Sequence, residues 1–188
     1  PASLSVVPAF LIDDIVDTLA FYKTLSETTK GPSLLSHVDA DLYVIFSIFT
    51  LASEAVKNPN TRGKAAKVLH GLLKEPRFAH ALQQPFAVRN ILPACVRVFT
   101  AVEKTRQSYY DIRMHVKFEL RIPIQELFEC LLTQAGHREQ LVAFAKDRKE
   151  EFTKFVNQLL NDTTYLLDEG LDTLSNIRSG RNTSTGAN

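Results

Sequence analysis

Residues Glu150 to Arg178, EEFTKFVNQLLNDTTYLLDEGLDTLSNIR, decide the fold that we expect for this chain. Their apolar residues recur at steps of one, three and four, which places them along one side of a helix. A helix over the whole stretch would be roughly 40 Å long. We therefore expect one long amphipathic helix that lies along several neighbouring helices. Within it, Gly170 is about 1 kcal/mol less favourable than alanine, and it predicts a close approach, a bend or a division into two helices.

The preceding sequence shows helical periodicity and no convincing alternation of the kind that a β-strand needs. Proline, glycine, asparagine and aspartate residues mark the expected helix ends. Asn58 is the clearest of these, because it can cap a helix whose first residue is Pro59. The expected helices cover residues 8–25, 42–56, 59–73, 78–82, 85–104, 109–134 and 137–148.

Two prolines lie inside these helical patterns, and each predicts a break. Proline in a helix interior removes a backbone donor and clashes with the preceding turn. We therefore expect Pro93 to interrupt its helix near Leu92, and Pro123 to divide residues 113–121 from residues 124–134. Gly136 is expected to separate that region from the helix that follows.

These patterns predict an all-α protein, either an armadillo-like α-α superhelix or an irregular helical bundle segment. We expect the helical core to span residues 6–178. Residues 179–188, SGRNTSTGAN, offer nothing to bury, and we expect a disordered polar tail there. Because the chain begins at Pro1 and its only methionine is Met114, we also expect a piece of a larger protein.

Composition argues against several classes of partner. The formal net charge is +1, which gives no bulk attraction to nucleic acid or to an acidic membrane surface. The longest apolar run, residues 42–52, is shorter than the ~20 residues of a membrane span. Two cysteines do not make a disulfide framework, which is typical of a reducing compartment. A loose basic series is diluted by acidic neighbours and predicts a solvated helix face; its members are Arg97, Lys104, Arg106, Arg113, Lys117 and Arg121.

No local pattern of catalytic, metal-binding or cofactor-binding residues is present. The five histidines have no partner at zinc-site spacing, and the seven glycines are scattered and form no phosphate-binding loop. We therefore expect no catalytic residue, no metal and no cofactor. A cysteine nucleophile could still assemble in space from Cys130 or Cys95 with His137 or His115. Buried thiols in apolar helices such as PACVRVF and LFECLL are usually inert, so this remains an alternative.

Three stretches resemble one known family when they are taken together. VKNPNTRGKAAKVL, residues 56–69, resembles the KNPxxRxK signature in the core of the U-box ubiquitin-chain elongation factors, or ubiquitin conjugation factors. NDTTYLLDEGLDTL, residues 161–174, is very similar to the NDxTxLLDExLxxL motif of that family. The opening PAFLIDDIVDTLAF, residues 8–21, resembles the segment that precedes both motifs. Asn60, Gly63 and Gly170 depart from the pattern, which usually has an apolar, an alanine-like and a serine-like residue there.

The resemblance implies a segment of an elongated superhelix of armadillo-like repeats, within a ligase whose U-box lies downstream of this chain. Through that U-box the family recruits the ubiquitin-conjugating enzyme and extends polyubiquitin chains on ubiquitinated substrates for proteasomal degradation. It also implies an AAA-type segregase ATPase and ubiquitin-shuttle proteins as partners, with location in the cytoplasm and nucleus. This segment itself would contact other parts of its own chain and act as a scaffold. The alternative is an armadillo or HEAT adaptor with no ubiquitin role, which binds a peptide or helix in a groove.

The motif positions have structural interpretations beside a partner-facing one. We expect Arg62 and Lys64 to hold an acidic helix end or to face a partner. Asn161 to Thr163 should interrupt the long helix where a loop docks, because such side chains favour backbone hydrogen bonds. Asp168 and Glu169 could pair with Arg62 or Lys64 across the core. The candidate site residues are thus Asn58, Pro59, Arg62, Lys64, Asn161, Asp162, Asp168 and Glu169.

Overall fold

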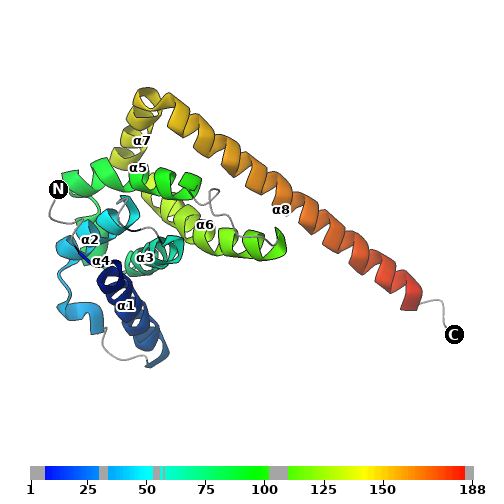
Figure 1. Cartoon of the computed structure of the whole chain (residues 1–188), viewed down its shortest axis with the longest axis horizontal. Coiled ribbons are helices and arrows are strands. Elements are labelled where there is room, and N and C mark those ends of the chain that lie inside the picture. The colour runs from blue at the N-terminus through cyan, green and yellow to red at the C-terminus, as the bar shows by residue number, and fades with distance from the viewer. Residues whose placement is uncertain (1–6, 30–33, 53–55, 57, 102–109, 185–188) are drawn as a thin grey trace.

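The computed structural model describes residues 7–29, 34–52, 56, 58–101 and 110–184 (Figure 1). Helices occupy nearly all of these ranges and no strand occurs within them, so the predicted all-α fold is confirmed. No helix in the described ranges is both long and apolar enough to cross a membrane. The elements are α1 (Ala9–Thr29), the 3-10 helix η2 (Leu34–His37), α2 (Ala40–Ala52), α3 (Pro59–Leu72), α4 (Pro76–Ala81), α5 (Pro85–Ala101), α6 (Tyr110–Leu132), α7 (Ala135–Asp147) and α8 (Lys149–Ser184).

Short polar side chains cap two of these helices, one of them at the predicted Asn58. The backbone N–H of Leu42 donates to Asp39 Oδ1 at 3.0 Å, so Asp39 caps α2. The backbone N–H of Asn60 donates to Asn58 Oδ1 at 3.0 Å, and Pro59 is the first residue of α3. Each cap satisfies a backbone donor that the first helical turn would otherwise leave unpaired. Gly31 and Pro32, a pair that typically ends a helix, follow α1 in the sequence and lie outside the described residues.

The expected breaks at Pro93 and Pro123 are wrong, because α5 and α6 each continue through their proline. Around Pro93, the neighbouring residues Ile91, Leu92, Ala94 and Cys95 are at most 1% exposed. Burial of each large apolar side chain stabilises the fold by about 1.5–3 kcal/mol, which offsets the roughly 3 kcal/mol penalty of an interior proline. The separation expected at Gly136 is present between α6 and α7, but it falls at residues 133–134, and Gly136 lies in the first turn of α7.

The core lies among α2, α3, α5 and α6, with α4, α7 and the first half of α8 packed on it. Phe155 anchors α8 to this core. Its ring meets Phe99 of α5 edge-on at 5.1 Å between centroids and stacks on Phe128 of α6 at 5.3 Å. A smaller cluster of Ile12, Val16, Val56 and Ala65 joins α1 to α3. Two long helices from distant parts of the sequence are thus fixed to one compact body.

The second half of α8 extends away from that body. We had expected the whole helix to lie along several neighbouring helices. Figure 1 shows α8 extending from its corner with α7 into free space. Its principal contacts are with α5 and α7. Along its outer half, five apolar residues are between 51% and 64% exposed: Leu166, Leu167, Leu171, Leu174 and Ile177. The periodicity therefore identified the helix correctly, but the described residues do not cover its outer apolar face.

Gly170 neither bends nor divides this helix. The assignment is continuous from Lys149 to Ser184, and a Cβ added at Gly170 would meet no atom within 4 Å. The helix also passes Arg178, where we expected the core to end and a disordered tail to begin. Residues 185–188 of that expected tail lie outside the described ranges.

Candidate functional site

The first motif, residues 56–69, forms the start of α3 and ties it to α1. Thr61 donates a hydrogen bond from its hydroxyl to Asp13 Oδ1, and Lys64 Nζ lies 2.6 Å from Asp17 Oδ1. Arg62 Nε donates to the carbonyl of Val56 at 2.7 Å. Lys64 and Asp17 are both more than half exposed, so their ion pair stabilises the fold by less than about 1 kcal/mol. The polar residues of the motif thus fix the register between α1 and α3.

The same motif borders a shallow hollow of about 670 Å³ between α3 and α6. Asn58, Lys64 and Lys67 line one side, and Glu119 and Glu126 line the other. The two helices approach closely here, because a Cβ added at Gly63 would lie 2.3 Å from Leu120 Cδ2 and 3.3 Å from Leu120 Cα. Glycine at a position where the related family has an alanine-like residue therefore permits this helix contact.

The second motif, residues 161–174, contributes one fully buried charge. Asp162 is 2% exposed, and its Oδ2 lies 2.5 Å from Nη1 of Arg121, which is itself 0% exposed. Both residues sit inside the body where α8 crosses α5 and α6. A buried ion pair of this kind is tolerated when the remaining donors of the cation are also satisfied.

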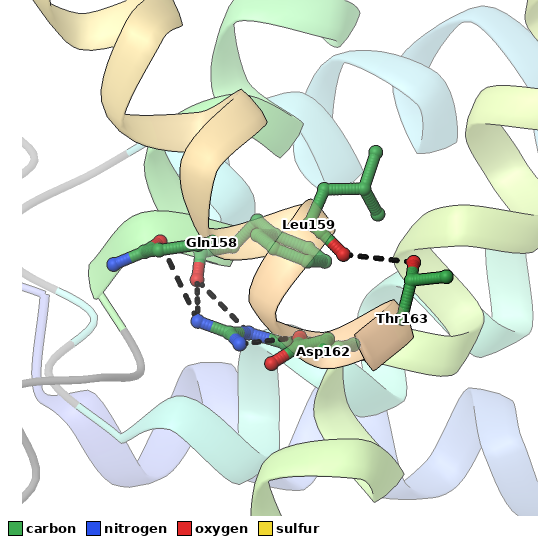
Figure 2. A network of polar contacts seen from close by, with 6 residues as sticks. Gln158, Leu159, Asp162 and Thr163 are labelled. Carbon is green, nitrogen blue, oxygen red and sulfur yellow. Dashed lines mark hydrogen bonds and ion pairs between the residues drawn. The ribbon is translucent and has the colours of Figure 1, made fainter. Parts of the chain in front are cut away.

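The other donors of Arg121 do find acceptors. Its Nε and Nη2 donate to the carbonyl oxygen of Phe99 at 3.3 and 3.1 Å, and Nη2 reaches Gln158 Oε1 at 3.4 Å. The guanidinium carbon lies 4.2 Å from the centroid of the Phe99 ring, a cation–π contact. Figure 2 shows Gln158 and Asp162 pointing toward this centre from successive turns of α8. One arginine therefore joins α6 to α5 and to α8.

We expected the segment around Asp162 to interrupt the helix, and this expectation is wrong because α8 is continuous there. Asn161 is exposed, and Thr163 donates its hydroxyl hydrogen to the Leu159 carbonyl at 2.9 Å within the helix (Figure 2). The prediction that Asp168 and Glu169 pair with Arg62 or Lys64 is also wrong. Both carboxylates are exposed on the outer half of α8, while Arg62 and Lys64 bond to Val56 and Asp17. The part of the motif that carries Asp168 and Glu169 is therefore exposed to solvent.

Arg121 is the functional residue that the sequence reasoning missed, since the diluted basic series predicted a solvated side chain. A signal was present. Arg121 shares a helical face with Ile124, Phe128 and Leu131, all of which are buried. Asp162 falls on the buried face of its own helix, with Phe155. Two opposite charges on two apolar faces predict a buried pair more directly than either charge does alone.

No hydrogen bond joins a cysteine to a histidine among the described side chains. Cys95 is buried, and burial raises the pKa of its thiol to about 12. Burial and the neighbouring Glu129 and Glu126 also raise the pKa of Cys130. His137 bonds through Nε2 to the Leu82 carbonyl at 3.0 Å, and burial lowers its pKa. The raised pKa values of the two thiols oppose thiolate formation, so they disfavour the cysteine-nucleophile alternative. The side chain of His115, the other histidine of that alternative, lies outside the described residues. The described residues contain no cluster that could ligate a metal.

Comparison with known proteins gives the decisive observation. The profile of the ubiquitin elongating factor core matches residues 1–186. The chain belongs to this family. It is similar to a probable ubiquitin conjugation factor E4 of Arabidopsis thaliana, 31% identical over 191 residues, and to the ubiquitin conjugation factor E4 of Schizosaccharomyces pombe, 31% identical over 188 residues. The E4 ubiquitin-protein ligase UFD2 of Saccharomyces cerevisiae is 27% identical over 194 residues.

These matches define how much of a family member the chain represents. They cover 95%, 95% and 97% of this chain, but only 17%, 18% and 19% of the respective relatives. The chain therefore spans less than a fifth of the length of these proteins. No solved structure is significantly similar to it.

Proposed function

We propose that this chain is a scaffold segment of a ubiquitin ligase that extends polyubiquitin chains on ubiquitinated substrates for proteasomal degradation. The observation that carries the proposal is the family match over residues 1–186. The second motif lies within this match and contains the buried Asp162. The segment would act through geometry. The ion pair of Asp162 with Arg121 fixes the direction of α8, and the rigid helix then sets the distance between distant parts of the ligase.

The partners follow from the same proposal. A downstream U-box would bind the ubiquitin-conjugating enzyme, and the substrate would already carry ubiquitin. We further propose an AAA-type segregase ATPase and ubiquitin-shuttle proteins as partners of the parent protein, which would reside in the cytoplasm and nucleus. Fluorescence imaging of the tagged parent tests the location, and pull-down with purified segregase and shuttle proteins tests the two partners.

Reconstitution of the full-length parent tests the central activity. The reaction contains ubiquitin-activating enzyme, a ubiquitin-conjugating enzyme, ATP, ubiquitin and a ubiquitin-fusion substrate. Gel analysis should show longer chains on the fusion than the conjugating enzyme produces without the parent. A parent that has no U-box downstream of residue 188, or that extends no chain on the fusion, would remove the ligase assignment. An adaptor role would then be the better interpretation.

A further inference from the structure

We draw no further inference here: the strongest candidate, the exposed apolar face on the outer half of α8 that is formed by Leu166, Leu167, Leu171, Leu174 and Ile177, carries none because nothing in the described part of the chain shows what covers it.

Discussion

Substitution of Asp162 by asparagine should severely destabilise the chain. The change keeps the shape of the side chain and removes its negative charge. The guanidinium of Arg121, with 0% exposed side-chain area, would then face neutral groups in place of a carboxylate, among them the Phe99 carbonyl, the longer contact to Gln158 and the Phe99 ring. Removing one partner of a buried pair is destabilising by about 3–5 kcal/mol, because the remaining charge stays uncompensated. We expect a loss near the lower limit, about 3 kcal/mol, since the carbonyl and the ring remain.

Urea unfolding followed by circular dichroism gives this free energy of unfolding. Asp168→Asn is the matched control, because it removes the same charge from the same helix at an exposed position. It should change the free energy of unfolding by no more than about 0.5 kcal/mol. The double variant Arg121→Met with Asp162→Leu should recover most of the lost stability, as buried pairs can often be replaced by packed apolar residues. A loss below about 1 kcal/mol for Asp162→Asn would refute the account of a desolvated pair.

Four further predictions concern single sites. Gly63→Ala should destabilise the chain by about 1–3 kcal/mol because the added Cβ meets Leu120. Gly170→Ala should stabilise it by about 0.5–1 kcal/mol because the added Cβ meets no atom within 4 Å, and the urea midpoints of the two variants test these opposite signs. Asn58→Ala should remove the α3 cap and about 1 kcal/mol, while Asn58→Gly removes only a few tenths; equal losses would contradict a capping role. Cys95, whose pKa burial raises to about 12, should resist iodoacetamide at pH 7.5 in the native chain and react in urea, as mass spectrometry of digests will show; native labelling of Cys95 would contradict its burial. Burial lowers the pKa of His137 below its ordinary 6.5, so the unfolded chain binds more protons below that pH and the free energy of unfolding should fall as the pH drops from 7 to 5. His137→Gln should flatten this dependence on pH, and an unchanged dependence would show that other groups cause it.

The sequence predicted the helices well because their signals are local. Periodicity identified the long helix, and Asn58 with Pro59 marked a helix start that the structure confirms. The breaks expected at Pro93 and Pro123 failed for a tertiary reason. Whether a proline breaks a helix depends on how much apolar surface the surrounding turns bury, and the sequence does not display that amount locally.

The candidate site was only partly predictable for a similar reason. The motif resemblance selected Asp162, but the identity of its partner depends on how α6 crosses α8, a contact between residues 41 positions apart. Asp168 and Glu169 belong to the same motif and lie only two turns further along α8. They are exposed because the described body ends before them. Residues of one continuous motif thus serve two purposes, an internal ion pair and an external surface.

The most direct test of the scaffold account measures chain extension by the full-length parent carrying Asp162→Ala. Two readouts are taken together: the length of the polyubiquitin chain on a ubiquitin-fusion substrate, and discharge of ubiquitin from the conjugating enzyme to free lysine. If the segment acts by positioning α8, chains on the fusion should shorten while discharge stays unchanged, and Arg121→Met with Asp162→Leu should restore chain length. Unchanged chain length with Asp162→Ala, or an equal loss of discharge, would contradict the account.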